Sequence, residues 1–345
     1  MRDFPAQQIP SGWYMVGWSS DFPLGEPKPL SYFGEDLVIY RGNSGHLIVL
    51  DAYCRHMGAH LGYGGCVEGD SIRCPYHGWV WGSDGANSEI PYSAPDKMGN
   101  LKLVKWRVHE VDEIVLVYYS NDGRPPIYDP PERMIRFDGE TWPAQQATTK
   151  IWLDEPISPQ YMAENAADAA HFKYVHRAAE IAEIGEFGAE GGVFKARLDL
   201  TFGGHAASTW ATPNGPVDGH IITENWGLGL GWSRLQAFDD VIYLLGITPT
   251  SPRTADMRAT TWVARKRGDG SLLPEKTRDL WAAQQNSQVD SDLRVWRHLS
   301  YIERAPWAQS ESKSMRVLRS WAKQFYPSET SAARVESTAI SGSTK

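Results

Sequence analysis

The chain has few cysteines, no long hydrophobic run and no excess of positive charge. Three cysteines among 345 residues, two of them within one motif, leave no disulfide framework. The formal net charge of -8 argues against nucleic-acid or anionic-membrane partners, which would select basic patches. No run approaches the roughly twenty apolar residues of a membrane span, and the first residues carry no cleavage signature. We therefore expect a cytoplasmic protein that is long enough for two domains.

Four potential metal ligands lie close together in the first third of the chain. Cys54-x-His56 is followed, after seventeen residues, by Cys74-x-x-His77. Two thiolates and two imidazoles are the ligands of a Rieske [2Fe–2S] cluster, in which histidines replace cysteines on one iron. Zinc is the alternative, but finger spacing places both cysteines before both histidines on a helix, and the glycines and Pro75 here oppose a helix. The spacing favours the Rieske cluster.

The residues around these ligands indicate which kind of Rieske centre is present. Rieske proteins of respiratory complexes carry an additional cysteine in each cluster loop, whereas this chain has Ala59 and Tyr76 at the matching places. The loops resemble those of bacterial Rieske oxygenases and their ferredoxins. The third cysteine, Cys66, is expected to be a small buried or loop residue.

Short β-type runs surround the cluster motif. They lie at 11–18, 37–41 and 46–50 before it, and near 103–108 and 113–119 after it. A segment at 121–132, dense in proline, glycine and charge, is typical of a linker. We predict a Rieske domain at 1–122, a catalytic domain at 123–327, and a polar, mobile tail at 328–345.

A helix is predicted to begin after Ser158 and to continue through about His176. Ser158 is a suitable N-cap, proline is favoured at the next position, and the segment is rich in alanine. Asp168 and His171 are three residues apart and would share a helix face. His171 and His176 are roughly 140° apart around a regular helix, so they could bind one metal only with a π-type bulge or a break after His171.

A second helix, predicted near 275–300, supplies a third candidate ligand. Its buried stripe is formed by Val289, Leu293, Trp296 and Leu299, and Asp292 falls within that stripe. Asp290 points away and has an i,i+4 partner in Arg294. A carboxylate on an apolar face is costly unless a cation meets it. His171, His176 and Asp292 together would form the facial triad of a non-haem Fe(II) site.

The segment from 193 to 265 alternates in five or more strands, including one at 205–212. The chain is therefore predicted to be an α+β protein. Its N-terminal antiparallel β domain is followed by a catalytic domain in which a curved antiparallel sheet, covered by helices, encloses a cavity. Trp210, Trp226 and Trp232 could line that cavity, or could be ordinary core residues.

Up to about residue 327 the chain resembles the oxygenase component of Rieske non-haem iron oxygenases. The cluster motif and the segment 165–176 carry this resemblance. The segments 288–296, 301–308 and 319–327 look most like the oxygenase of 3-ketosteroid 9α-hydroxylase. The resemblance implies a monooxygenase in which electrons pass from the cluster to the iron, where one atom of O2 enters an unactivated C–H bond of a steroid or steroid-like substrate.

The resemblance also implies how the protein assembles and which other residues contribute. It implies a homotrimer, in which Asp168 bridges a cluster histidine of one subunit to an iron histidine of the next. Asn165 would lie near the iron or in the subunit contact, although an ordinary surface amide is equally consistent. Because Gly227-Leu-Gly229-Leu-Gly231 lacks the spacing of a dinucleotide loop, a separate NAD(P)H-dependent flavin and iron–sulfur reductase, or a ferredoxin with its reductase, must deliver the electrons.

Two alternative functions remain open from the sequence. Another Rieske oxygenase activity, such as aromatic ring hydroxylation, O- or N-demethylation or sterol desaturation, would use the same ligands. A Rieske electron carrier would need only the first domain, so the facial triad of the second half argues against it.

Overall fold

The computed structural model describes residues 8–93, 100–135, 141–142, 148–203, 212, 215–237, 239–267 and 269–327. The chain divides into two compact units. One unit is Tyr14–Tyr119, and the other combines the residues before Tyr14 with those from Ser120 onward. The predicted tail at 328–345, and all but the last residue of the strand predicted at 205–212, lie outside the described residues.

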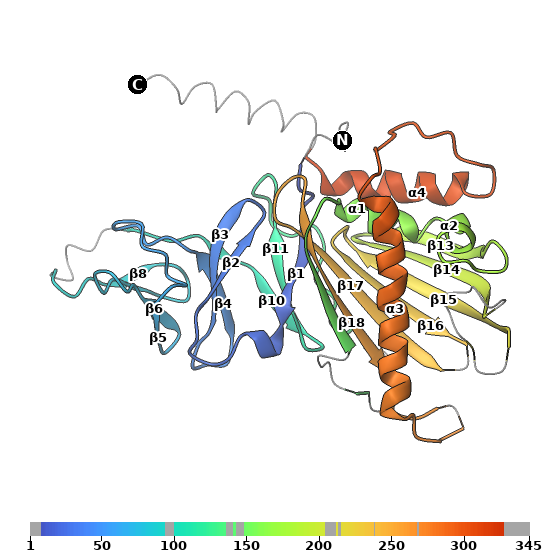
Figure 1. Ribbon diagram of the computed structural model, residues 1–345. Helices are drawn as coiled ribbons and strands as arrows, with labels where there is room; N and C mark the ends of the chain where they lie inside the picture. Colours follow the sequence, from blue (N-terminus) through green and yellow to red (C-terminus); the bar gives the residue numbers. More distant parts are fainter. Residues whose placement is uncertain are drawn as a thin grey trace. The chain divides into compact units, whose positions relative to one another are not determined.

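Short strands form three small sheets in the unit Tyr14–Tyr119 (Figure 1). The N-terminal β domain expected from the sequence is therefore present, although β2 and the strands around the cluster loops were not predicted. The sheet orders are β1-β11-β10, β2-β3-β4-β9 and β5-β6-β7-β8. The strands are β1 (Gly12–Trp18), β2 (Lys28–Tyr32), β3 (Glu35–Arg41), β4 (Leu47–Asp51), β5 (Cys66–Glu68), β6 (Ser71–Arg73), β7 (Val80–Trp81), β8 (Asn87–Glu89), β9 (Lys105–Trp106), β10 (Val108–Val111) and β11 (Ile114–Tyr119).

The core of this unit includes the two motif cysteines. Cys54 follows β4 and Cys74 follows β6, and both side chains are buried among apolar residues. Their buried neighbours include Val38, Leu50 and Trp81, from three different strands. The core therefore holds both thiols in fixed positions.

A seven-stranded antiparallel sheet dominates the second unit, as the sequence predicted. Its order is β12-β18-β17-β16-β15-β14-β13, so successive strands are neighbours except where β12 joins β18. The strands are β12 (Thr149–Glu155), β13 (Glu183–Glu190), β14 (Val193–Phe202), β15 (Val217–Trp226), β16 (Leu230–Gln236), β17 (Asp240–Pro249) and β18 (Ala255–Val263).

Among the described residues, four α-helices accompany this sheet. The long helix α3 (Glu275–Trp296) crosses one face of the sheet and contacts β18 (Figure 1). Helix α4 (Ser312–Ala322) packs on β13 and on the short helix α1 (Pro159–Asn165), which is followed by α2 (Ala170–Tyr174). Because α3 ends at Trp296, Leu299 lies beyond the helix and is exposed, contrary to the predicted stripe.

Both ends of the described chain meet within the second unit. The Ser11 N–H donates to the carbonyl of Phe325 at 2.7 Å. The Asn121 amide donates to the carbonyls of Ile9 and Phe325 at 3.2 and 3.0 Å. These bonds join three segments that are far apart in the sequence. Among the described residues, no helix is long and apolar enough to cross a membrane.

Candidate metal centres and pocket

The two cluster loops share one backbone conformation. In each loop the cysteine N–H donates to the carbonyl five residues later, at 2.9 Å for Cys54 and 2.8 Å for Cys74. Each cysteine carbonyl accepts from a glycine four residues later, Gly58 at 2.9 Å and Gly78 at 3.1 Å. Both glycines have a φ near +74°, which glycine adopts without strain. The two loops are thus a matched pair that presents one thiol and one imidazole each.

The four ligand side chains fit a [2Fe–2S] cluster. Neither Cys54 nor Cys74 forms a disulfide, and both are buried. The rings of His56 and His77 lie edge to face with centroids 4.6 Å apart. The Nδ1 atom of His77 is buried and has no hydrogen-bonding partner among the described residues. A buried nitrogen without a hydrogen-bonding partner destabilises the fold, and a bond from this nitrogen to a metal would remove that penalty.

The surroundings of Cys54 suit a thiolate that binds metal. Burial raises the pKa of the Cys54 thiol, the His56 N–H and the Trp81 indole oppose that rise, and nearby Cys74 adds to it. The Trp81 Nε1–H donates to the Cys54 Sγ at 3.4 Å. Two buried thiols side by side would repel each other as anions, and a bound cation removes that repulsion.

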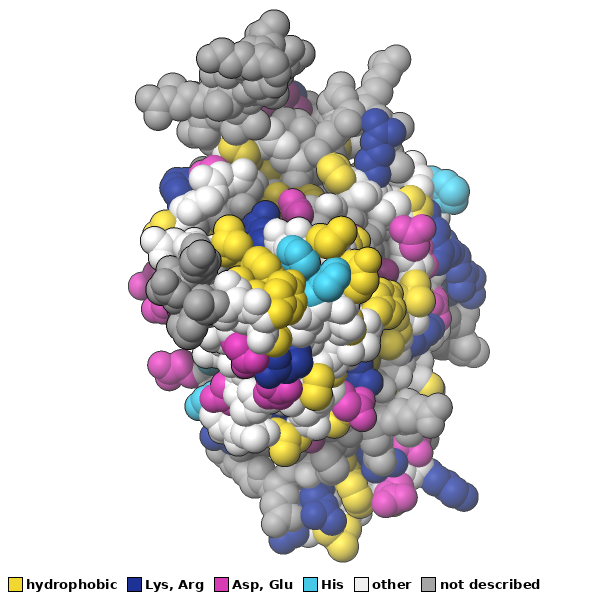
Figure 2. All heavy atoms as spheres, turned by 90° about the vertical axis from the view of Figure 1, so that its left-hand side faces the viewer, with side chains coloured by type: hydrophobic (Ala, Val, Ile, Leu, Met, Phe, Trp, Pro, Cys, Tyr) yellow, Lys and Arg dark blue, Asp and Glu magenta, His cyan; other side chains and the backbone are white. Residues whose placement is uncertain are grey.

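Exposed apolar side chains surround the cluster loops. Met57, Tyr63, Tyr76 and Tyr92 are all more than half exposed. Figure 2 shows two adjacent histidine side chains on this part of the surface, bordered by hydrophobic ones. The histidine edge of the cluster site is therefore accessible to another protein. Cys66, at the start of β5, is exposed rather than buried.

The single helix predicted at 158–176 is interrupted. Helix α1 ends at Asn165 and α2 begins at Ala170. The Ser158 side chain caps α1, as expected, by accepting from the Gln160 N–H. Asp168 then acts as a second cap, because its Oδ1 accepts from the N–H groups of Ala170 and His171 at 2.9 and 3.3 Å. This capping competes with helix continuation and overrides the alanine-rich composition.

His171 is held in the form that can bind a metal. Its Nδ1 lies 2.7 Å from the backbone carbonyl of Asp168. A carbonyl can only accept, so Nδ1 carries the proton and Nε2 keeps its lone pair for a metal. Burial lowers the pKa of His171, whereas Asp292 raises it and His176 lowers it further. The net lowering favours the neutral imidazole, which is the ligand form.

His176 lies beyond the end of α2, so the predicted break between the two histidines is present. The helix ends at Tyr174, and Arg177 adopts a left-handed φ of 58°. The Ala178 N–H donates to the carbonyl of Phe172 at 2.9 Å, which closes a loop around His176. This turn brings the two imidazoles together with centroids 5.1 Å apart.

Asp292 on α3 completes the group. Its Oδ1 lies 3.2 Å from the Nε2 of His176, and both side chains are buried. One ligand atom from each of His171, His176 and Asp292 lies within 4.8 Å of the others. Two imidazoles and one carboxylate at this spacing are the donor set that non-haem Fe(II) prefers. The residues therefore fit a mononuclear iron site, and the structure brings together the three side chains that were predicted as its ligands.

Asp290 does not pair with Arg294, and that part of the sequence argument was wrong. Its carboxylate accepts from the Lys150 ammonium at 2.8 and 2.9 Å and from the Trp152 indole at 2.8 Å. Both partners lie on β12, which the helical wheel does not include. Asp290 thus anchors α3 to the sheet, while Asp292 faces the histidines.

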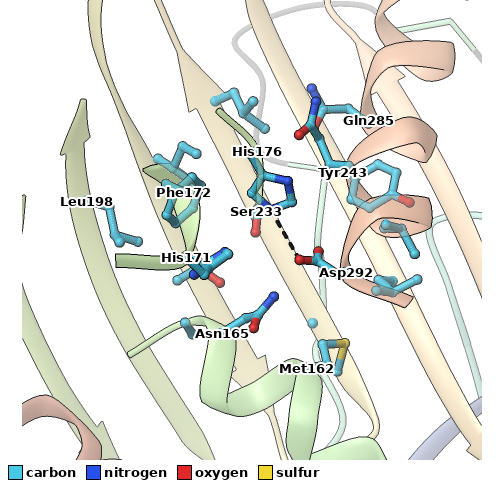
Figure 3. Close-up of a pocket in the computed structure, with 18 of the residues that line it drawn as sticks. Met162, Asn165, His171, Phe172, His176, Leu198, Ser233, Tyr243, Gln285 and Asp292 are labelled. Carbon is cyan, nitrogen blue, oxygen red and sulfur yellow. Dashed lines mark ion pairs between the residues drawn. The ribbon is translucent and has the colours of Figure 1, made fainter. Parts of the chain in front are cut away.

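A pocket extends from the three candidate iron ligands (Figure 3). Helix α1, helix α3 and the sheet strands β14–β17 form its walls, and Asn165 also reaches it. Trp226 and Trp232 do not line it, and Trp210 lies outside the described residues. The lining residues are Met162, Asn165, Ala166, His171, Phe172, His176, Leu198, Ile221, Thr223, Asn225, Gly231, Ser233, Leu235, Tyr243, Leu245, Gln285, Gln288, Val289, Asp292 and Trp296.

Most of these lining residues were missed by the sequence analysis. On β15, Ile221, Thr223 and Asn225 alternate along one face, a period-two signal that could have identified them once the strand was placed. On α3, Gln285 lies seven residues before Asp292 and so shares its face. No local sequence motif identifies the amide side chains of Asn225 and Gln285 as pocket residues.

Two family models cover most of the chain. A Rieske [2Fe–2S] domain matches residues 12–111, and the 3-ketosteroid 9α-hydroxylase C-terminal domain matches residues 117–326, more than half of the chain. The matches place the motif cysteines and histidines in the first model and the three candidate iron ligands in the second.

Relatives and solved structures agree with these models. The oxygenase component of 3-ketosteroid-9-alpha-monooxygenase from Mycolicibacterium smegmatis is 28% identical, over 91% of this chain and 82% of that protein. Cholesterol 7-desaturase from Hemicentrotus pulcherrimus is also 28% identical, over 92% of this chain and 70% of that protein. Apo dicamba monooxygenase has the same fold, with a TM-score of 0.67 at 16% identity, covering 95% and 100% of the two chains.

Proposed function

Because this chain belongs to the 3-ketosteroid 9α-hydroxylase family of Rieske oxygenases, we propose that it is the terminal oxygenase of a multicomponent steroid monooxygenase. The cofactors are a Rieske [2Fe–2S] cluster and a mononuclear non-haem iron. The substrate is a steroid or a steroid-like hydrophobic molecule, and one oxygen atom from O2 enters a C–H bond of that molecule.

The observation that carries this proposal is the pocket that opens on the candidate iron ligands. His171, His176 and Asp292 line one wall of it, and apolar side chains such as Leu198, Leu235 and Leu245 line much of the rest. A mainly apolar pocket beside the facial triad suits a hydrophobic substrate whose reacting carbon carries no activating group.

Each ligand residue has a separate task in this proposal. Cys54, His56, Cys74 and His77 hold the cluster, and His171, His176 and Asp292 hold the iron. When bound, the two centres supply electron storage and the activation of dioxygen, respectively. The Asp168 carbonyl keeps the His171 Nδ1 protonated and so directs its Nε2 to the metal. Apolar pocket walls exclude water from the reacting carbon.

Asp168 is further proposed to link two subunits of a homotrimer. Its Oδ1 caps α2, while its Oδ2 lies 3.8 Å from the His171 Nδ1, and the side chain is 34% exposed. A partly exposed carboxylate next to a candidate iron ligand could accept the N–H of a cluster histidine from a neighbouring subunit. Asn165, the last residue of α1, is proposed to contact the substrate or the iron site, because it lines the pocket.

Electrons are proposed to come from a separate NAD(P)H-dependent reductase, directly or through a ferredoxin, in the cytoplasm. Relatives of this chain are named as oxygenase components of monooxygenases, which supports a multicomponent system. The half-exposed His56 and His77, with the exposed apolar side chains around them, give such a donor an accessible docking surface.

Sterol desaturation is the second candidate function. Cholesterol 7-desaturases from Hemicentrotus pulcherrimus and Drosophila melanogaster are each 28% identical to this chain, the same level as the monooxygenase components. Removal of two hydrogens would need the same iron ligands and a different substrate placement. The two functions therefore differ in product and not in cofactors.

One experiment tests the proposal and separates the alternatives. Iron- and cluster-replete protein is incubated with NADH, a ferredoxin and its reductase, ¹⁸O2 and a panel of 3-ketosteroids, sterols and aromatic acids. We expect a steroid product that gains one ¹⁸O atom. Loss of two hydrogens from a sterol would indicate the desaturase, and gain of two ¹⁸O atoms by an aromatic acid would indicate a dioxygenase. No product from any steroid or sterol, with both cofactors loaded, would refute the steroid assignment.

A further inference from the structure

Two buried amide side chains in the pocket have N–H groups that find no hydrogen-bonding partner among the described residues. Asn225 on β15 is 1% exposed and Gln285 on α3 is 5% exposed. The Asn225 Nδ2 and the Gln285 Nε2 are buried, and no described residue accepts a hydrogen bond from either. Both residues line the pocket. Leaving a buried donor without a partner is costly, so an unpartnered amide in a pocket suggests that a ligand accepts its hydrogen bond.

Asn225 lies at the Met162 end of the pocket. It pairs with Gly231 on the neighbouring strand β16. A Cβ atom added to Gly231 would lie 3.2 Å from the Asn225 Oδ1 and 2.9 Å from the Met162 Sδ. The Asn225 amide and the Met162 thioether are therefore neighbours across the space that this glycine leaves open.

Gln285 lies at the other end. It precedes Asp292 by seven residues on α3, which places it on the same face and about 10 Å away along the helix axis. Figure 3 shows Gln285 and Met162 at opposite ends of the labelled residues, with Asp292 between them. The two amides thus lie on opposite sides of the candidate iron ligands.

The pocket wall between the amides is mainly apolar. Leu198, Ile221, Leu235, Leu245 and Val289 line it. A ligand that matches this pattern has a rigid apolar body and an acceptor oxygen near each end. Apolar contact would supply most of its affinity, and the two amides would fix its orientation.

We propose that Asn225 and Gln285 each donate a hydrogen bond to an oxygen at opposite ends of the substrate, and so select steroids that are oxygenated at both ends. This inference rests on the proposed function, because it concerns the same pocket and the same reaction. Fixing both ends of a rigid molecule determines which of its central carbons faces His171, His176 and Asp292. Asn225 and Gln285 would therefore control the site of attack as well as affinity.

The test compares three ligands and three variants. The ligands are androstane-3,17-dione and the two monoketones that carry only the 3-oxygen or only the 17-oxygen. Asn225→Leu and Gln285→Met remove one donor each with little change in side-chain size. Leu235→Ala, which removes apolar contact only, is the matched control. Dissociation constants are measured by calorimetry on the loaded protein under argon without reductant, so that no turnover occurs.

We expect each amide variant to bind the dione about tenfold more weakly, the effect of one lost hydrogen bond. Each amide variant should also bind one of the two monoketones about tenfold more weakly and bind the other almost as well as the wild-type protein does. The weakened monoketone should be a different one for each variant. Leu235→Ala should weaken all three ligands by a similar factor. Circular dichroism and melting temperature identify any variant that fails to fold, and for such a variant Asn225→Ala or Gln285→Leu replaces it.

Several outcomes would overturn the inference. They are equal loss for all three ligands, selection of the same monoketone by both variants, or no binding of any steroid by the wild-type protein. The proposed function is tested separately by turnover. Hydroxylation without the expected selectivity refutes only the role of the amides, whereas the expected selectivity without oxygenated or desaturated product refutes only the proposed reaction.

Discussion

Asp290 and Asp292 lie two residues apart on α3, and their carboxylates contact different partners on opposite faces of the helix. Asp290 accepts hydrogen bonds from Lys150 and Trp152 on β12. Asp292 lies 3.2 Å from the Nε2 of His176 in the pocket. The first carboxylate fixes the helix to the sheet, and this fixed helix sets the position of the second.

The two aspartates provide a matched pair for a test of iron binding. In Asp292→Asn, the anionic ligand is lost and iron affinity should fall by at least about tenfold, since the loss of an outer partner alone costs 10–100-fold. In Asp290→Asn, the ion pair with Lys150 is lost, so the melting temperature should fall while iron is retained. Iron per chain is measured by mass spectrometry after gel filtration. Normal iron content in Asp292→Asn would contradict the ligand assignment.

Substitution of Asp168 by asparagine separates its two proposed roles. Asparagine caps a helix about as well as aspartate, so α2 and the melting temperature should change little. The charge next to His171 is removed, and oxidation of the reduced cluster by O2 and substrate should slow by about tenfold or more. Stopped-flow absorbance measures this oxidation. Unchanged cluster oxidation and coupled turnover would exclude a bridging role.

Gly231 provides a test of pocket shape. In Gly231→Ala, the added methyl group would approach the Met162 sulfur at 2.9 Å and the Asn225 Oδ1 at 3.2 Å. We expect KM for the steroid to rise by about tenfold with little change in folding, because Met162 can shift into the pocket. Gly188→Ala is the control, since nothing lies within 4 Å of a Cβ atom at that position on β13. Equal KM values in the two variants would contradict the proposed position of the substrate.

The indole of Trp81 is expected to tune the cluster. Its Nε1–H donates to the Cys54 Sγ at 3.4 Å, and a donor to a ligand sulfur stabilises the more negative, reduced cluster. Trp81→Phe should therefore lower the reduction potential by about 40 mV, the equivalent of one hydrogen bond of about 1 kcal/mol. Spectroscopic redox titration measures the shift. An unchanged or raised potential would show that the indole does not act on the cluster.

The ion pair between Arg41 and Glu110 should make the first unit sensitive to acid. Arg41 donates to both Glu110 oxygens, at 2.8 and 2.9 Å, and this bonding lowers the pKa of Glu110 against the opposing effect of burial. Because this pKa is lower in the folded chain than in the unfolded one, the stabilisation is present above the unfolded pKa. It is lost as the pH falls through the folded pKa.

Glu110→Gln is therefore expected to lower the melting temperature at pH 7, and this effect should become smaller as the pH falls. The partly exposed pair is screened by solvent, so the change at pH 7 should be about 1–3 °C. Glu26→Gln, which removes the exposed pair with Lys28, is the control and should change nothing measurable. Scanning calorimetry at a series of pH values measures the difference. An effect of Glu110→Gln that is independent of pH would contradict the electrostatic explanation.

The sequence predicted which candidate ligands would lie together better than it predicted the local structure that presents them. Both loops are short and each contains one cysteine and one histidine, so the spacing of Cys54, His56, Cys74 and His77 was sufficient to predict them as cluster ligands. The helix around His171 was predicted as one piece because alanine favours helix. The structure divides it because the Asp168 side chain caps a second helix, and a single-residue interaction of this kind is weak evidence in a sequence.

The pocket amides show what the sequence could not reveal. Asn225 is a polar residue in a strand and Gln285 a polar residue in a helix, and neither pattern is unusual. Their significance appears only when β15 and α3 face one space, which depends on sheet order and helix packing. The pairing of Asp290 with Lys150 was not predicted for the same reason, because 140 residues separate the two partners in the sequence.

The bonds that join Ser11, Asn121 and Phe325 have a consequence for biosynthesis. The whole segment from Tyr14 to Tyr119 leaves the ribosome long before Phe325 emerges, so the segment that holds the four candidate cluster ligands can fold while translation continues. The unit that holds the candidate iron ligands is completed later, because its N-terminal segment can bond to Phe325 only after that residue has been synthesised. Iron–sulfur assembly can therefore precede completion of the oxygen-activating half of the molecule.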